Sequence, residues 1–315
     1  MLRTIELTYP HSLTMDQLPE TVAAIGFFDG IHLGHQKVIN HAISEAKKRD
    51  MESAVITFHP HPSVVLKKDV QHVQYITPLK EKQEILEKLD VDRLYIITFN
   101  KELSSLSPQQ FIDDFIIGLN IKHLVAGFDY SFGFKGKGNM KNIAEYTRDK
   151  FTFTTIDKVE MDNEKVSSTK IRGLLQVGNV EEVQRLLGRP LIVSGTVVEG
   201  DKRGKKLGYP TANLHIHPDA LLPKPGIYAV KVKYKQEYLE GMASLGYNST
   251  FTADRSDLSM EVNIFDYKNN LYGQQLQVEW WKYVREEIKF DHVEALIDQM
   301  ADDEREIREF FSNTK

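Results

Sequence analysis

The stretch Gly26-Phe27-Phe28-Asp29-Gly30-Ile31-His32-Leu33-Gly34-His35-Gln36 decides the fold of the first half of the chain. It follows an apolar, β-prone run (residues 21–25) and leads into residues 37–49, whose apolar positions recur at helical spacing. We therefore predict a strand, a glycine-hinged turn and the start of a helix. His32 and His35 would lie on one face of that helix, beside backbone N–H groups without intrahelical partners and near the positive end of the helix dipole. This arrangement favours a phosphate site.

Gly34 leaves no side chain above the turn, so a nucleotide could approach the backbone closely. By spacing alone, the two histidines could instead be metal ligands or buried core residues that hydrogen bonds satisfy. The identity of the residues in this stretch favours the phosphate site over these alternatives. His32-Leu33-Gly34-His35 resembles the His-x-Gly-His signature of the nucleotidyltransferase superfamily. The longer string Gly-x-Phe-Asp-Gly-x-His-x-Gly-His-Gln resembles one family within it, the bacterial bifunctional riboflavin kinase/FMN adenylyltransferase, or FAD synthetase.

Composition narrows the class of protein. With 315 residues, two domains are expected, and 41% hydrophobic and 27% charged residues are typical of a folded protein. The net charge of −5 gives no reason to expect a nucleic-acid partner or an anionic membrane surface. There is no cysteine, which excludes disulfides and thiol catalysis. The first residues lack the apolar core of a signal peptide and no apolar run is long enough to span a membrane, so we expect a cytoplasmic protein.

The first half alternates short apolar strands with helices. Strands are predicted at residues 21–25, 53–58, 94–99 and 123–127, with helical patterns between them. Such alternation implies an α/β domain with a Rossmann-like parallel sheet. Ligands bind beyond the carboxyl ends of the strands in such sheets, so the loops that follow these strands should share one site.

His59-Pro60-His61-Pro62 follows the second of these strands. The histidines could be metal ligands, but alternating prolines stiffen the backbone and no carboxylate or cysteine lies nearby in sequence, so we favour a stiff turn. The resemblance implies that this loop lines the flavin and nucleotide cleft.

Residues 127–139 combine glycines, lysines and four aromatic residues. Taken alone, this segment could be a solvated basic loop, and it is not a Walker A loop because no Gly-Lys-Ser/Thr follows. In the family, the matching Gly-x-Asp-(Phe/Tyr)-x-Phe-Gly run borders the adenylylation site, which implies roles for Asp129 and Phe132.

Residues 166–172 precede a predicted helix at residues 173–177. Hydroxyl side chains here are ordinary N-caps, yet hydroxyls, exposed N–H groups, Lys170 and Arg172 in one turn would also bind phosphate. The family carries Ser-Ser-Thr-x-x-Arg at this place, a segment that closes on the triphosphate.

The reaction that the resemblance implies is a direct displacement in which the phosphate of FMN attacks the α-phosphorus of ATP and pyrophosphate leaves. His32 and His35 would donate to phosphate oxygens, Lys170 and Arg172 would take charge on the β- and γ-phosphates, and Mg²⁺ would share that charge. The resemblance makes His32, His35 and Arg172 catalytic. The ATP-binding set that it implies is Gly26, Phe28, Asp29, His32, Gly34, His35, Ser167, Ser168, Thr169 and Arg172, and the flavin-binding set is His59, Pro60, His61, Pro62, Asp129 and Phe132.

The character of the chain changes near residue 187, where Gly188-Arg189-Pro190 ends a helical pattern. We therefore predict a domain boundary there, and the resemblance implies an adenylyltransferase domain at 1–187 and a riboflavin kinase domain at 188–315. Strand-like runs separated by short turns predict a small antiparallel β-barrel in the second domain, and apolar spacing from residue 293 to residue 311 predicts a terminal helix. The predicted strands are residues 191–198, 226–234, 238–245, 259–265 and 275–281.

Residues 200–213, Gly200-Asp201-Lys202-Arg203-Gly204-Lys205-Lys206-Leu207-Gly208-Tyr209-Pro210-Thr211-Ala212-Asn213, lie between the first two of these strands. The basic glycine-rich part could be a solvated hairpin tip. Its end presents a hydroxyl and an amide two residues apart, which are hard oxygen ligands suited to Mg²⁺. The string resembles the riboflavin kinase signature Gly-x-x-x-x-Gly-x-x-x-Gly-x-Pro-Thr-Ala-Asn, which implies that Thr211 and Asn213 hold Mg²⁺-ATP. The kinase ATP-binding set is then Gly200, Lys202, Gly204, Gly208, Thr211 and Asn213.

Glu261 alternates with apolar neighbours and could simply face solvent. The resemblance makes it the catalytic base that accepts the proton of the riboflavin 5′-hydroxyl, and it places Arg285 near the flavin.

One position departs from the family pattern, since Ser249 stands where the family usually has proline. A freer backbone there could loosen the hold on substrate. The expected function is phosphorylation of riboflavin by ATP to FMN, followed by adenylylation of FMN by ATP to FAD. We expect a monomer or weak homo-oligomer. Two alternatives are a monofunctional FMN adenylyltransferase with a weak barrel and a non-catalytic flavin-binding regulator.

Overall fold

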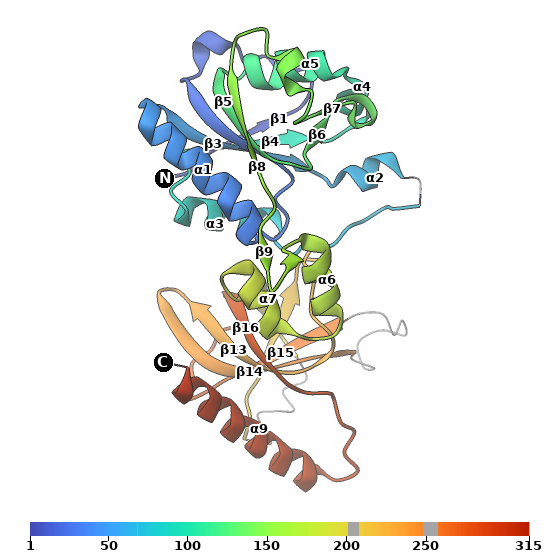
Figure 1. The fold of residues 1–315 in the computed structure, drawn as a ribbon. Helices are drawn as coiled ribbons and strands as arrows, with labels where there is room; N and C mark the ends of the chain where they lie inside the picture. Colours follow the sequence, from blue (N-terminus) through green and yellow to red (C-terminus); the bar gives the residue numbers. More distant parts are fainter. Residues whose placement is uncertain (68, 201–207, 248–257, 315) are drawn as a thin grey trace. The chain divides into compact units, whose positions relative to one another are not determined.

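The computed structural model describes residues 1–67, 69–200, 208–247 and 258–314. Its contacts divide the chain into two compact units, Met1–Ser167 and Ser168–Lys315, drawn in Figure 1. The division lies upstream of the boundary at residue 187 that the sequence suggests, so residues 168–187 are described here with the second unit. Ser249, Lys202 and Gly204 lie outside the described ranges.

A six-stranded parallel sheet forms the centre of the first unit, in the order β1-β4-β3-β2-β5-β8. The sequence predicted the four inner strands but missed both edge strands. β1 and β8 are half exposed and carry polar residues, so neither reads as a buried apolar run. The six strands are β1 (Arg3–Leu7), β2 (Thr21–Ile25), β3 (Glu52–His59), β4 (Arg93–Thr98), β5 (Ile121–Gly127) and β8 (Thr152–Ile156).

Both faces of this sheet are covered. Every residue of β2 is buried, and alternate side chains enter two separate cores, Val22 and Ala24 on one face, Ala23 and Ile25 on the other. Helices α1 (Leu33–Arg49) and α3 (Leu79–Lys88) cover the first face, while α5 (Pro108–Ile112) and a π-helical turn (Asp113–Ile117) cover the second. A ligand must therefore approach the edge of the sheet.

The carboxyl edge of the sheet carries most of the short elements. α2 (Pro62–Leu66) follows β3, α4 (Lys101–Ser105) follows β4, and β6 (Ser131–Phe132) and β7 (Gly138–Asn139) follow β5. These loops frame the region where the carboxyl ends of β2, β3, β4 and β5 meet. The remaining short elements are the helical turns Met15–Gln17, Phe134–Gly136 and Ile143–Tyr146 and the strand pair β9 (Glu160–Met161) and β10 (Glu164–Lys165).

The second unit is a closed antiparallel barrel in the order β11-β12-β15-β14-β13-β16. The sequence predicted all of these strands except β12, where Pro210 and the basic loop before it suggested a turn. Helices α6 (Ser168–Gln176) and α7 (Val180–Leu187) precede the barrel, and α9 (Val293–Asn313) follows it. The barrel strands are β11 (Leu191–Val198), β12 (Ala212–Ile216), β13 (Gly226–Tyr234), β14 (Glu237–Tyr247), β15 (Leu258–Ile264) and β16 (Gln275–Arg285).

Two apolar clusters hold the barrel together. Trp280 is fully buried and its ring contacts Tyr228 edge to face, with centroids 4.8 Å apart. Ile307 and Phe311 of α9 pack against the strands in a separate cluster with Ile227, Ala229, Met242 and Phe265. The terminal helix that the sequence predicted thus contributes side chains to the core. Figure 1 shows its course as α9. Within the described ranges, no helix is long and apolar enough to cross a membrane.

His123 links β5 to the edge strand β8. It is buried, its Nδ1 lies 2.6 Å from Thr152 Oγ1, and its Nε2 lies 3.0 Å from Thr154 Oγ1. Burial lowers its pKa to about 4. Because the folded protein favours the neutral ring, the stability that this ring contributes is present above pH 6.5 and is lost as the pH falls toward 4.

We predict that His123→Gln makes the free energy of unfolding depend less on pH between pH 6.5 and pH 4. The free energy of unfolding of the wild-type protein should fall between pH 6.5 and pH 4, and His123 alone should account for at most ~3 kcal/mol of that fall. Chemical denaturation at several pH values measures this. Equal slopes for the variant and the wild type would contradict the assignment, because other histidines are common to both.

Candidate active sites

The turn after β2 presents His32 and His35. Phe28 and Ile31 have positive φ angles of 51° and 42°, and His32 caps α1 by accepting the His35 N–H on its Nδ1 at 3.2 Å. The helix thus begins at Leu33, earlier than the predicted Lys37. The two rings are stacked with centroids 3.6 Å apart. A Cβ atom at Gly34 would lie 3.0 Å from the His32 ring, a tight contact that glycine avoids.

Both histidines are held in the neutral form. Burial lowers the pKa of His32 to about 4. Burial also lowers the pKa of His35 well below its ordinary value, with further lowering from the neighbouring His32, Lys82 and Lys165. Since His32 Nδ1 accepts a hydrogen bond, we assign the proton of the neutral ring to Nε2. His32 therefore offers one N–H donor at neutral pH.

A cavity of about 630 Å³ opens at this edge of the sheet. Its walls are mainly apolar and aromatic, which suits a flat ring system. His35 is part of the wall, and so are Gly26 and Phe28 of the turn and Pro62 of the next loop. The aromatic residues of the wall are Phe27, Phe28, Phe58, Phe99, Phe111, Tyr130, Phe132 and Phe134.

The His59–Pro62 loop packs against the turn. His61 caps α2 by accepting the Ser63 N–H, and its ring contacts Phe27 edge to face at 4.6 Å. The His61 N–H donates to the Tyr75 hydroxyl at 3.0 Å, and the ring of His59 lies 5.8 Å from the same tyrosine. Among the described residues, no three His, Cys, Asp or Glu side chains gather closely enough to hold a metal ion.

Asp129 and Phe132 both line the cavity, and so does Phe28, which precedes Asp29 in the turn. Phe132 is buried and stacks on Phe111 with centroids 5.7 Å apart. Asp29 is itself buried and accepts the Thr77 N–H at 3.1 Å, which ties the turn to the chain before α3.

Lys165 was missed by the sequence reasoning. Its Nζ lies 2.7 Å from Asp129 Oδ2 and 4.7 Å from the centre of the Phe128 ring, and its charge acts on both histidines. Only the β9–β10 hairpin brings it there, and nothing local in the sequence signals that pairing.

The Ser-Ser-Thr segment differs from the prediction in its local structure. Helix α6 begins at Ser168 rather than at Gly173, so Ser168, Thr169, Lys170 and Arg172 are helical and only Ser167 precedes the helix. The predicted role of these residues in holding a triphosphate is not tested by this observation and stays a prediction.

In the barrel, strand register gathers the second set of residues. Asn213 of β12 pairs with Glu261 of β15, and the Thr211 hydroxyl donates to Glu261 Oε2 at 3.1 Å. A Cβ atom at Gly200 would collide with the Asn213 amide, so glycine lets the strand end approach that side chain. Gly208 has a φ of +89°, which favours glycine.

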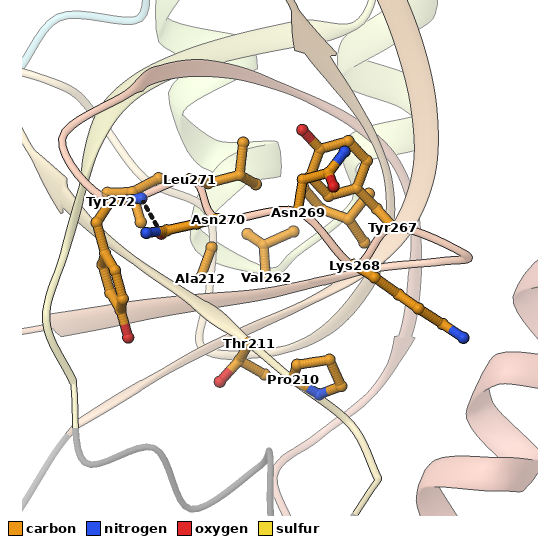
Figure 2. A pocket seen from close by; sticks show the side chains of 12 residues that line it. Pro210, Thr211, Ala212, Val262, Tyr267, Lys268, Asn269, Asn270, Leu271 and Tyr272 are labelled. Atoms are coloured by element: carbon orange, nitrogen blue, oxygen red, sulfur yellow. Dashed lines mark hydrogen bonds between the residues drawn. The ribbon is translucent and has the colours of Figure 1, made fainter.

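A cavity of about 370 Å³ lies beside this cluster. Figure 2 shows Pro210 and Thr211 at one end, Leu271 and Asn270 at the other, and Ala212 and Val262 between them. The segment 267–272 forms the far wall. Sequence reasoning missed this segment because its turn residues have no chemical signature of their own.

Arg285 takes a position that the sequence did not indicate. Its Nε and Nη2 donate to Asp303 at 2.8 Å and 2.6 Å, and Asp303 is only 2% exposed. The pair joins β16 to α9 in a bidentate geometry. The predicted flavin contact of Arg285 stays a prediction.

Asn263 was also missed. It is buried on β15, and its Nδ2 donates to the Pro210 carbonyl at 2.7 Å. It therefore fixes the turn that carries Thr211.

The two units together define a two-domain phosphate-transfer enzyme, with a His-x-Gly-His turn on a parallel sheet and a Pro-Thr-Ala-Asn turn on a barrel. Sequence families agree with this division, since the FAD synthetase family matches residues 14–170 and the riboflavin kinase family matches residues 187–311. The chain belongs to the family of bifunctional riboflavin kinases/FMN adenylyltransferases.

Full-length relatives carry that name. The Listeria monocytogenes protein is 45% identical over 99% of both chains, and the Bacillus subtilis protein is 42% identical over 100% of both. The Escherichia coli K12 protein is 33% identical over 97% of both. A crystal structure titled as a macrolide-efflux protein from Streptococcus pneumoniae has a TM-score of 0.87 and 35% identity, covering 97% of this chain and 98% of its own.

We predict that Asn263→Asp lowers riboflavin phosphorylation. A carboxylate cannot donate to the Pro210 carbonyl, so the turn loses one buried hydrogen bond, and kcat/KM should fall about tenfold. FMN adenylylation in the same preparation is the control, because Asn263 and Pro210 are not among the residues proposed for that activity. Equal loss of both activities, or no loss, would argue against this role.

Proposed function

We propose that the chain phosphorylates riboflavin to FMN in the barrel and adenylylates FMN to FAD in the first unit. The observation that carries the proposal is that each unit joins a phosphate-type turn to a cavity of small-molecule size. His35 lines the 630 Å³ cavity and Thr211 lines the 370 Å³ cavity. FAD has a flat flavin and a pyrophosphate, and an aromatic cavity beside a helix start suits both parts.

In adenylylation, the FMN phosphate attacks the α-phosphorus of ATP, one P–O bond forms and another breaks, and pyrophosphate leaves. The chain needs to position two anions and to stabilise the charge that moves between them. His32 would donate through Nε2–H, and His35 would act from the cavity wall. Because both rings are neutral near pH 7, they bind phosphate as hydrogen-bond donors rather than as cations.

The remaining adenylyltransferase residues complete the proposal. Ser167, Ser168, Thr169, Lys170 and Arg172 would hold the triphosphate. The flavin would lie in the aromatic cavity between Pro62 and Phe132, with Asp129 at its wall. Gly26, Phe28, Asp29 and Gly34 would shape the turn for ATP, and the remaining loop residues His59, Pro60 and His61 would support the flavin side.

In phosphorylation, Glu261 would accept the proton of the riboflavin 5′-hydroxyl as its oxygen attacks the γ-phosphorus, and ADP leaves. Its carboxylate already accepts from Thr211, which fixes its orientation. Thr211 and Asn213 supply hydroxyl and amide oxygens beside this carboxylate, a donor set that fits Mg²⁺. When bound, Mg²⁺ would neutralise charge on the β- and γ-phosphates. Gly200, Lys202, Gly204 and Gly208 would cover the phosphates, and Arg285 would contribute near the flavin.

The proposal includes the setting in which the enzyme works. We infer that it acts in the cytoplasm on small molecules, without nucleic acid or membrane, as a monomer or weak homo-oligomer. The acidic balance of the chain supports this, since a net charge of −5 disfavours binding to polyanions.

Two substitutions test the division of labour. His32→Ala should lower FAD formation from FMN at least about a hundredfold and leave FMN formation intact, while Glu261→Ala should do the reverse. Each activity is measured separately by chromatography of the flavins, and each serves as the folding control for the other.

Loss of both activities in one folded variant would contradict two independent sites. No product from riboflavin in the wild type, with FAD formed when FMN is supplied, would point to the monofunctional enzyme. No product from either substrate would point to the flavin-binding regulator.

A further inference from the structure

Lys82 is a buried lysine beneath the adenylylation turn. It lies in α3, is 4% exposed, and directs its Nζ to the Phe27 carbonyl at 2.8 Å and to Thr57 Oγ1 at 3.2 Å. The Thr57 hydroxyl donates to the same carbonyl at 2.9 Å. Two donors from two elements, α3 and β3, therefore converge on one carbonyl of the turn.

Such a position is unfavourable for a charge. Burial lowers the pKa of Lys82 to about 8, and the nearby charge of Asp29 opposes that shift only in part. Lysine is rarely buried unless it is paired, and a methionine of similar shape would fill the space without desolvating an ammonium group. Packing alone therefore does not account for a lysine here.

The contacts of Lys82 connect it to the turn and to the loop that follows β3. Its Nζ lies 5.0 Å from the centre of the Phe27 ring, and that ring contacts His61 of the next loop. Its charge also acts on His35. The carbonyl that it holds belongs to the residue between Gly26 and Phe28, both of which line the cavity.

We propose that Lys82 is a positioning residue for adenylyl transfer, which fixes the Phe27 carbonyl and adds a positive charge beneath the site for phosphate. It acts through the turn and does not itself touch the reacting atoms. This inference rests on the proposed adenylylation of FMN at the same site.

Other charged and titratable groups lie around the site and bear on a test of its pH dependence. Asp29 of the turn faces Lys82, and His35 of α1 is stacked on His32. Lys165 of β10 acts on both histidines, and Asp129 acts on His32. The chain has no cysteine, so no thiol titrates near pH 8.

The hydrogen bonds and the charge of Lys82 can be separated by pH. A neutral amine still has two N–H groups, one for Phe27 and one for Thr57, so deprotonation removes the charge and keeps both bonds. If the charge matters, FAD formation by the wild type should decline as the pH rises through about 8. FMN and ATP phosphates are already ionised in that range and would not cause the decline.

Three variants complete the test. Lys82→Met removes bonds and charge, and Lys82→Arg keeps the charge at all accessible pH values. Thr57→Val keeps the charge and removes the Thr57 hydroxyl, which donates to the same carbonyl and accepts from Lys82 Nζ. We expect kcat/KM for adenylylation to fall about a hundredfold in Lys82→Met and less than about tenfold in Thr57→Val. With rates normalised at pH 7, Thr57→Val should keep the alkaline decline and Lys82→Arg should lose it.

Riboflavin phosphorylation in the barrel, measured at each pH, is the internal control. An alkaline decline that persists in Lys82→Arg, or its absence from the wild type, would overturn the role of the charge. Equal losses in Lys82→Met and Thr57→Val would reduce Lys82 to a structural donor. If Lys82→Met does not fold, the pH dependence of FAD formation in the wild type, Lys82→Arg and Thr57→Val still tests the role of the charge. A wild type that forms no FAD from FMN at any pH would refute the proposed function instead.

Discussion

The hydrogen bond from the His35 N–H to His32 Nδ1 is the contact on which the first site depends. It uses an imidazole as a helix cap, so the residue that ends the turn also starts α1 and holds its ring against the ring of His35. This works only while His32 is neutral, because a protonated Nδ1 could not accept. Burial supplies that condition by lowering the pKa of His32 to about 4. The fold therefore buries His32, burial keeps its ring neutral, and only the neutral ring can cap α1.

The sheet makes the constraint possible. β2 is buried on both faces, so packing fixes the position at which the turn begins. Asp29 and Lys82 then hold the turn from below through Thr77 and the Phe27 carbonyl. The barrel reaches an equivalent result by register alone, since pairing of β12 with β15 sets Asn213 opposite Glu261 and brings Thr211 within hydrogen-bond distance. One chain thus positions the two proposed phosphate sites by different means.

Much of this could be predicted from sequence because the signals are local. Buried apolar runs predicted the inner strands, and the His-x-Gly-His and Pro-Thr-Ala-Asn strings indicated the two turns. Edge strands β1 and β8 were not predicted because half-exposed strands lack such runs, and β12 was not predicted because Pro210, two residues before it, suggested a turn. Lys82, Lys165 and Asn263 could not have been found this way. Each contacts its partner from more than thirty residues away, and only the fold brings the two together.

Most of the first site lies in loops that follow strands, and two of these loops contact each other. The turn at Gly26–Gly30 and the His59–Pro62 loop share ring contacts through Phe27 and His61. Ser167 and the first residues of α6 carry the remaining predicted contacts of this site to phosphate.

The most direct test of two activities in one chain is a time course. Purified protein is incubated with riboflavin, ATP and Mg²⁺, and riboflavin, FMN and FAD are separated by chromatography. Two sites acting in sequence predict that FMN appears first and that FAD follows at its expense. FAD without a preceding FMN phase, or FMN that never becomes FAD when ATP is in excess, would contradict the account.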